Sequence, residues 1–369
     1  MQTNSLSMAA WQARRLKFSL RCALVAMLGS LGFSLIATHQ LNRVPILSLD
    51  ALPRFDLVQN PNSLSSILGF LTLAISAIVV ALGFRRLTHY DPTASPLERQ
   101  AATIGKEWIG RFAVSLTVSL MLFGISLAAM LLWARLFEGS AFTRLGVIVL
   151  AVGYGGALAF GLAYWSVTLK TRQMFSLAIA FMLYGVVLAG LISADREWWQ
   201  RSLSALGHDS AAGLIFNLSV IGGGLILLAV AIEEVEMLAL LQAAGILKRR
   251  GFAVLRFSLI AICVLMIGIG LFPSRVSVLS NVMHNLAAHS MVGVIILLMF
   301  TVTAFAPIFP RHFKHVSLGF GAACIGFVAL YGLRLLDFLT MEVLIISTCG
   351  AWLFYFKMQT EAYARRLPV

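Results

Sequence analysis

Ten separate apolar blocks constrain this chain more than any other feature of its sequence. They lie near residues 19–38, 64–84, 112–134, 145–166, 175–193, 211–232, 254–272, 286–308, 317–334 and 341–358. A helix that crosses the hydrocarbon core of a bilayer needs about 20 apolar residues. Because lipid offers no partner for backbone N–H and C=O groups, each block must satisfy its own as an α-helix. The sequence therefore predicts an all-α, polytopic integral membrane protein with ten transmembrane helices.

The distribution of charge predicts how these helices are oriented. The chain is 60% hydrophobic and 12% charged, with a formal net charge of +13. With the N-terminus inside, 20 of the 28 lysines and arginines fall on inner segments and 8 on outer ones. This bias predicts that both termini are cytoplasmic. Topology and anionic lipid at the inner leaflet then explain the positive charge, so we expect membrane lipids as partners and no nucleic acid.

Three further features bear on the class of protein. The first apolar block is longer than the 7–15 residues of a signal peptide and lacks a convincing cleavage site, so we interpret it as a retained anchor. All four cysteines lie within predicted helices, so no disulfide framework is indicated. No G-x-S-x-G, Walker, H-E-x-x-H or C-x-x-C signature occurs. These absences argue against an enzyme, and no cofactor is predicted.

The inner loop at 167–174 divides the predicted spans into two groups. Residues 1–174 hold four spans and residues 175–369 hold six. Each group has a long outer loop, at 39–63 and at 194–210, that ends in a serine-rich Ser-Leu-Ser stretch before the next span. This shared pattern suggests a repeat, which is common among transporters. In the second group, residues 233–253 predict either an amphipathic cytoplasmic helix or an extension of the sixth span.

Polar residues from two outer loops form the strongest candidate site. It comprises Ser204, His208, Asp209, Asn217, Asn281, His284 and His289. Asp209 or Ser210 is also a natural N-cap for the sixth span. His284 and His289 are five residues apart and do not share a helix face, which disfavours a metal site. We expect His284 to be an interfacial or loop-facing residue, and His289 to lie deeper, facing the bundle interior with a polar partner.

Two other features of the apolar blocks invite a structural interpretation. Arg334 and Asp337 are three residues apart and predict a helical ion pair, with Glu342 at the start of the last span. Gly222, Gly223 and Gly224 follow no strand, so they predict close helix packing or a hinge and no dinucleotide site.

The C-terminal half also resembles a bacterial family of six-helix membrane proteins of unknown function, in the Frag/DRAM/Sfk-like group. The matching residues are Leu203 to Gly207, Phe216-Asn217, Phe272-Pro273 and His284, within 175–358. The resemblance implies a six-helix bundle with a polar outer pocket in a bacterial inner membrane, and no reaction. Such proteins are often labelled ABC-transporter permeases. The four N-terminal spans depart from the family pattern.

Three functions remain open from the sequence. A transporter or permease-like protein fits the ten spans and the candidate repeat. An ABC ATPase or other membrane subunit is then a candidate partner, with 238–251 as its docking segment. A non-catalytic scaffold or regulator, and a membrane enzyme acting on a lipid-like substrate at the outer interface, are the alternatives.

Overall fold

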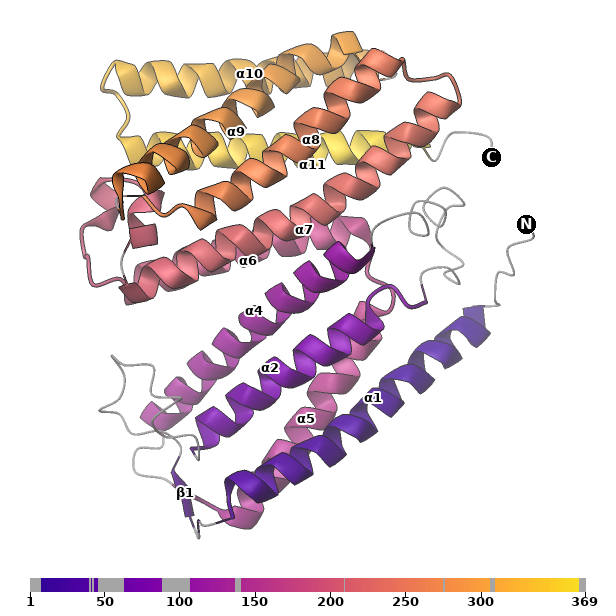
Figure 1. Ribbon diagram of the computed structural model, residues 1–369, viewed down its shortest axis with the longest axis vertical. Helices are drawn as coiled ribbons and strands as arrows, with labels where there is room; N and C mark the ends of the chain where they lie inside the picture. Colours follow the sequence, from indigo (N-terminus) through magenta and orange to yellow (C-terminus); the bar gives the residue numbers. More distant parts are fainter. Residues whose placement is uncertain are drawn as a thin grey trace. The chain divides into compact units, whose positions relative to one another are not determined.

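The described part of the chain is helical apart from one small ribbon. The structure is a computed structural model that describes residues 8–39, 41, 43–45, 63–87, 107–136, 141–208, 210–274, 276–305 and 309–364. Ten of its helices are long and apolar enough to cross a membrane (Figure 1). This confirms the predicted all-α, multi-pass membrane architecture. The side on which each terminus lies stays a prediction.

The chain divides into two compact units. The first comprises Met1–Ala94 and Val114–Lys170, and the second comprises Ser95–Ala113 and Thr171–Val369. The division after Lys170 lies within the inner loop at which the sequence analysis placed a boundary.

The first unit is built around one helix with a stripe of small residues. Its helices are α1 (Met8–Ala37), α2 (Leu64–Gly83), most of α4 (Glu107–Leu136) and α5 (Arg144–Ser166). Ala151, Gly155, Ala159 and Ala163 recur at every fourth position of α5, and all four are buried. A side chain at Gly155 would collide with Ser30 of α1 and approach Ile75 of α2. Small residues let membrane helices approach closely, so α5 packs against both α1 and α2.

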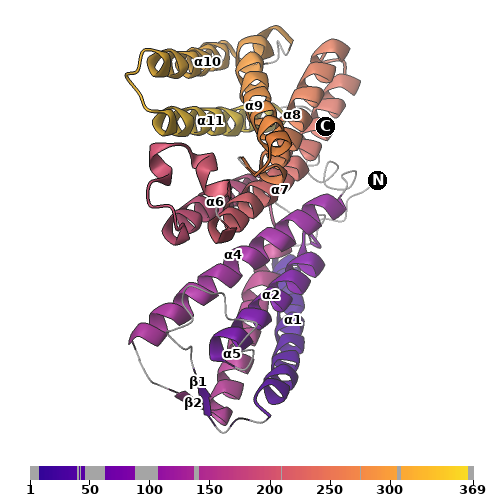
Figure 2. The ribbon, with the colours of Figure 1, turned by 60° about the vertical axis from the view of Figure 1, so that its left-hand side comes forward.

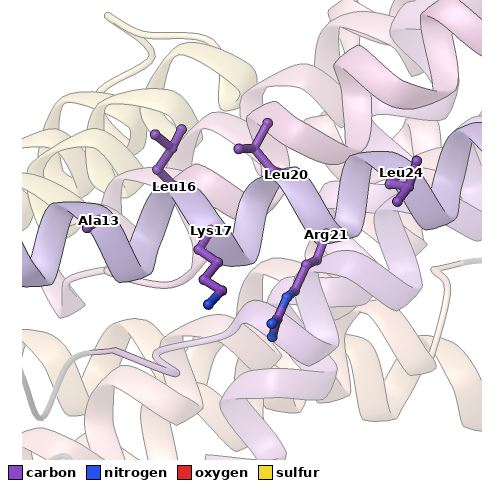
Figure 3. Close-up of a pocket in the computed structure, with 6 residues that line it drawn as sticks. All are labelled: Ala13, Leu16, Lys17, Leu20, Arg21 and Leu24. Carbon is purple, nitrogen blue, oxygen red and sulfur yellow. The ribbon is translucent and has the colours of Figure 1, made fainter.

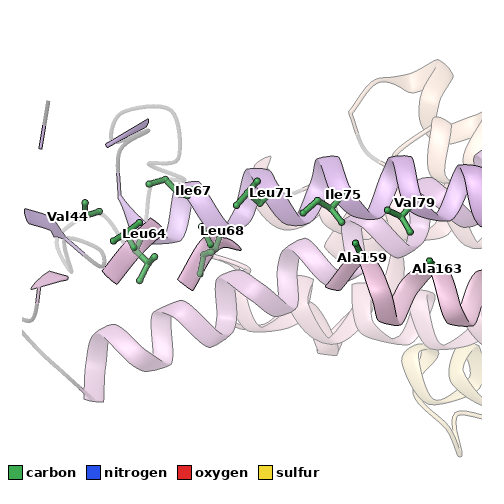
Figure 4. Close-up of a cluster of buried hydrophobic side chains, with 11 residues drawn as sticks. Val44, Leu64, Ile67, Leu68, Leu71, Ile75, Val79, Ala159 and Ala163 are labelled. Atoms are coloured by element: carbon green, nitrogen blue, oxygen red, sulfur yellow. The ribbon is translucent and has the colours of Figure 1, made fainter. Parts of the chain in front are cut away.

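The core of this unit lies along one face of α2. Leu64, Leu68, Leu71, Ile75 and Val79 are buried and follow the spacing of three and four that keeps side chains on one helix face (Figure 4). Ala159 and Ala163 of α5 belong to the same cluster.

Three hydroxyl groups add a polar contact within this apolar core. Thr72 of α2 lies 2.6 Å from the Tyr154 hydroxyl of α5 and 3.1 Å from the Ser126 hydroxyl of α4. Ser126 and Tyr154 are 2.7 Å apart. Thr72 also donates to the Leu68 carbonyl at 2.7 Å. Hydrogen bonds between membrane helices each stabilise packing by about 0.6–2 kcal/mol, so this triad joins α2, α4 and α5.

A two-stranded ribbon, which the sequence analysis did not predict, covers one end of the first unit. β1 (Arg43–Pro45) pairs antiparallel with β2 (Ala141–Thr143), with Val44 opposite Phe142. Val44 is fully buried in the unit's core. The described start of the first outer loop therefore caps the bundle of the first unit. Residues 46–62 lie outside the described residues.

The second unit contains six long helices. They are α6 (Thr171–Ile192), α7 (Ser210–Ala243), α8 (Arg249–Leu271), α9 (Val278–Phe305), α10 (Arg311–Gly332) and α11 (Phe338–Ala364), with the short η3 (Trp198–Gln200) and η4 (Leu203–His208) between α6 and α7. Neighbours in sequence from α6 to α9 pack side by side, and α10 contacts α9 and α11 (Figures 1 and 2).

The long α7 decides between the two predictions for residues 233–253. It has 34 residues and continues to Ala243, and α8 begins at Arg249 after a short turn. The extension of the sixth span is therefore confirmed, and a separate amphipathic helix is wrong. The reason is local: Gly245 adopts a positive φ of 74°, which ends α7 in a tight turn and starts α8 five residues after Ala244.

The triple glycine lies where α6 and α8 both press against α7. A Cβ atom on Gly223 would lie 2.5 Å from Met182 Cγ of α6. One on Gly224 would lie 2.8 Å from Ile267 Cγ1 and 3.2 Å from the Ile267 backbone nitrogen of α8. Gly222, Gly223 and Gly224 are all buried. The predicted role in close helix packing is thereby confirmed.

Candidate functional site

The η4 segment is the centre of the predicted outer cluster, and hydrogen bonds hold it on three sides. Ser274, which follows α8, donates to the Ser204 carbonyl at 3.0 Å. The backbone N–H of Leu203 donates to Glu342 Oε2 of α11 at 2.8 Å. Asn217 Nδ2 of α7 donates to the Gly207 carbonyl at 2.8 Å. All three bonds use backbone groups of η4. The segment therefore links α7, α11 and the residues that follow α8.

The two Ser-Leu-Ser stretches form the same local cap. Ser63 Oγ lies 3.0 Å from Ser65 Oγ and accepts from the Ser66 N–H at 3.2 Å. Ser202 Oγ lies 3.1 Å from Ser204 Oγ and accepts from the Ala205 N–H at 3.2 Å. The likeness stops at this cap, because α6 packs mainly on α7 whereas α1 packs mainly on α5. A repeat of the two groups of spans stays a prediction.

The structure reverses the expected positions of the two histidines. His284 is only 5% exposed, and its Nδ1 lies 3.2 Å from the Ile269 carbonyl and 3.0 Å from the Phe272 carbonyl. Two carbonyl oxygens can only accept, so Nδ1 carries a proton. Both carbonyls belong to the C-terminal end of α8, where helical C=O groups lack intrahelical partners. His284 therefore joins α9 to the end of α8.

His289 faces away from the bundle. Its side chain is exposed, and Nδ1 lies 2.6 Å from the carbonyl of Asn285, one turn earlier in α9. The prediction that His289 faces the bundle interior was wrong, and His284, expected to be interfacial or loop-facing, is the buried one of the two. Both residues belong to α9, which begins at Val278, and the end of α8 lies on the side of His284.

We expect His284→Ala to lower the stability of the second unit by about 1–2 kcal/mol, because two buried carbonyls lose their donor. The midpoint of thermal unfolding in detergent measures this. His289→Ala is the matched control and should leave the midpoint unchanged, since its bond stays within α9. Equal losses in the two variants would contradict the assignment.

The remaining predicted residues do not converge on one point. Ser204 is half-buried in η4, and Asn281 is half-buried in the first turn of α9, where its N–H donates to the Ser277 carbonyl. His208 ends η4, and Asp209 lies outside the described residues, as does its predicted capping role. Among the described side chains, no three of His, Cys, Asp and Glu are grouped as metal ligands would be.

The predicted pair of Arg334 and Asp337 was wrong, because neither residue lies within a helix. Arg334 is in the turn after α10 with a φ of 60°, and Asp337 precedes α11. Asp337 instead caps α11: its carboxylate accepts from the Thr340 N–H at 2.8 Å and the Thr340 hydroxyl at 2.6 Å. Glu342 lies in the first turns of α11 as predicted, but it is used to hold η4.

The Asp337 cap predicts a local dependence on pH. The Thr340 hydroxyl, followed by the Thr340 N–H, lowers the pKa of the Asp337 carboxyl. A lowered pKa means that the cap stabilises α11 above the ordinary aspartate pKa of about 3.9. This stabilisation is lost as the pH falls through the lowered value. Amide exchange of the first turn of α11, corrected for intrinsic rates, should rise in that range in the wild type and not in Asp337→Asn.

A buried charge cluster, absent from the sequence predictions, lies between α7 and α11. Glu234 is 4% exposed and Lys357 is 5% exposed. Lys357 Nζ lies 2.8 Å from Glu361 Oε1 and 3.5 Å from Glu234 Oε2. Glu234 Oε1 is buried and makes no hydrogen bond to any residue that the structure describes. We call Glu234, Lys357 and Glu361 the charge cluster.

Aromatic side chains and a further carboxylate are near the charge cluster in the sequence. Phe356, directly before Lys357 in α11, and Trp352, one turn earlier, are fully buried, and their tilted rings have centroids 5.6 Å apart. The residue before Glu234, Glu233, accepts from the Thr171 hydroxyl of α6 at 2.6 Å. The signal in the sequence was a lysine within an apolar block, with an acid four residues later. The positive-inside comparison treated Lys357 only as one of the 20 inner lysines and arginines.

Two hollows that lie along helices of the described structure are lined by residues outside the predicted outer cluster. One, of about 370 Å³, runs along α1 between Ala13 and Leu24, with Lys17 and Arg21 extending from one side (Figure 3). All of its lining residues belong to α1, so it is a surface of one helix and not a cavity between helices. The second, of about 970 Å³, lies along α8 and reaches α7 and α9.

No protein-family model, curated protein or solved structure matches this chain. The resemblance of 175–358 to a six-helix family therefore stays a prediction.

Proposed function

We propose that this protein is a permease-like membrane transporter whose working site is the charge cluster. The supporting observation is Glu234, a carboxylate 4% exposed within an apolar, membrane-spanning helix. Ionisable groups inside membrane spans are costly, and in pumps and transporters they form ion sites and proton relays. Two carboxylates face one ammonium here. Glu234 Oε1, which is buried and makes no hydrogen bond to a described residue, is the atom that takes up a proton or a small cation.

The geometry suggests how such binding acts on the helices. Lys357 sits between Glu361 on its own helix and Glu234 on α7, and the longer contact, 3.5 Å, is the one between helices. A proton or cation on Glu234 weakens the attraction of that carboxylate for Lys357. Because this contact joins α7 to α11, its loss favours a different arrangement of the two helices. Alternation between two such arrangements is what transport requires.

This proposal moves the working site away from the outer polar pocket. His284, Asn217 and Glu342 each bond to a backbone group of another segment, and none lines either hollow. They are better suited to holding the outer end of the second unit than to binding a solute.

The experiment is solute movement in proteoliposomes loaded with a cell metabolite extract. Mass spectrometry reads which solutes leave, with and without an imposed proton gradient. We expect wild-type protein to move a defined solute faster than empty vesicles, and Glu234→Gln to lose the effect of the gradient. Glu342→Gln is the matched control: it changes an acid on α11 that bonds only η4 among the described contacts.

Three outcomes oppose the proposal. Gradient-driven movement in Glu234→Gln that equals the wild type would remove the charge cluster as the site. Protein-dependent chemical change in the vesicle lipids, read by the same mass spectra, would favour the lipid-enzyme alternative. Vesicles that match empty ones in both readouts would favour a scaffold or regulator.

A separate binding experiment tests whether an ABC ATPase is a partner. The purified ATPase is added with nucleotide to the protein in detergent, and its association is measured.

A further inference from the structure

The hollow along α8 has two chemically different ends. Gln242 at the end of α7 and Arg249 and Arg256 of α8 line one end. Ile260 and Val264 of α8 line the other, and Ser290 and Val294 of α9 form part of its wall. Arg249 and Arg256 are seven residues apart, which is two helical turns, so both guanidinium groups are on the same face of α8.

The two arginines have no anionic partner within the described structure. Neither guanidinium makes a hydrogen bond or ion pair with a described residue. α8 also begins at Arg249, and its N-cap residue, Lys248, makes no side-chain capping bond. The positive end of the helix dipole therefore lies at the same end of the hollow. A fixed positive potential without an internal counter-ion favours an anion there.

The dimensions fit a molecule that has a charged head and an apolar tail. With a rise of 1.5 Å per residue, Arg249 to Val264 spans about 22 Å. Half of a bilayer's hydrocarbon core is about 15 Å thick, so the hollow extends from the headgroup region into one leaflet. Its far end is apolar, and Phe257 and Val264 are strongly exposed along it, as expected for a surface in contact with acyl chains.

From these observations we infer that the hollow along α8 binds one anionic phospholipid, with its phosphate between Arg249 and Arg256 and an acyl chain along Ile260 and Val264. This site is separate from the charge cluster and does not depend on the proposed transport. Arginine suits this role because its planar fork can donate two hydrogen bonds to one phosphate.

Native mass spectrometry of the full chain, released from vesicles of phosphatidylglycerol and phosphatidylcholine mixed in equal amounts, tests the site. We expect wild-type protein to retain one phosphatidylglycerol in preference to phosphatidylcholine. Arg249→Gln and Arg256→Gln should each weaken retention about tenfold, through the loss of a charge-assisted bond. Arg250→Gln is the matched control, since Arg250 is adjacent, is exposed and does not line the hollow.

A further variant tests the apolar part of the hollow without changing its charged end. Ala261→Phe keeps both arginines and fills the apolar part of the hollow, so it should also reduce lipid retention. Equal retention of the two lipids, or an Arg250→Gln loss as large as that of Arg256→Gln, would overturn the inference. Displacement of the lipid by millimolar inorganic phosphate would show a site for a soluble anion. Retention of a second copy of the chain in place of lipid would show a protein interface.

Discussion

Replacing Lys357 with methionine should destabilise the second unit by about 3–5 kcal/mol, the cost of breaking a buried ion pair from one side. The change leaves Glu234, at 4% exposure, with no opposing charge among the described ion pairs and brings it into repulsion with Glu361. Glu234→Gln should cost much less, because Lys357 keeps its shorter contact, 2.8 Å, to Glu361. Folded yield in detergent and the midpoint of thermal unfolding measure both variants.

The double variant Glu234→Gln with Lys357→Met is the decisive control. It removes one charge of each sign, so most of the stability lost in Lys357→Met should return. If the double variant is as unstable as the sum of the two single variants, the two residues do not interact and the cluster is not a unit. A Lys357→Met protein as stable as the wild type would also show that Glu234 and Lys357 do not interact.

Replacing Gly224 with leucine should cost about 3 kcal/mol, at the upper end for an overpacked core. A Cβ atom there meets Ile267 Cγ1 at 2.8 Å and the Ile267 backbone nitrogen at 3.2 Å. The side chain of Ile267 can turn aside, but its backbone belongs to α8 and cannot move without shifting that helix. We therefore expect lower folded yield and a lower unfolding midpoint.

Gly293→Leu in α9 is the control for this prediction. No described atom lies within 4 Å of a Cβ built at Gly293, and the residue is exposed. It should leave the unfolding midpoint unchanged or raise it slightly, because leucine favours a helix more than glycine does. Comparable losses at Gly224 and Gly293 would mean that the helix, and not the contact with α8, requires glycine.

Features that depend on local sequence were predicted well. The ten spans follow from runs of apolar residues that have no alternative to helix in lipid. The packing role of Gly222 to Gly224 follows from residue size alone. The β1–β2 ribbon was missed because it pairs residues about a hundred positions apart, Val44 with Phe142, and each strand has only three residues, too few for a period-two pattern.

The candidate site was predicted less well, because polarity does not tell which way a side chain points. His284 and His289 have the same chemistry and lie five residues apart, yet one holds the end of α8 and the other faces outward. Their roles depend on where α9 begins and which helix lies beside it. Asp337 was assigned to an ion pair because helix ends at the two sides of a short turn cannot be placed within one residue from sequence.

By itself the sequence determined that this chain crosses a membrane ten times, because hydrophobicity and backbone hydrogen bonding in lipid act residue by residue. The tertiary structure alone decided which polar groups meet. Glu234 and Lys357 are 123 residues apart, and they form one charge cluster only because the tertiary structure brings α7 and α11 into local contact. Such a contact depends on the arrangement of whole helices, which the apolar pattern of each helix does not encode.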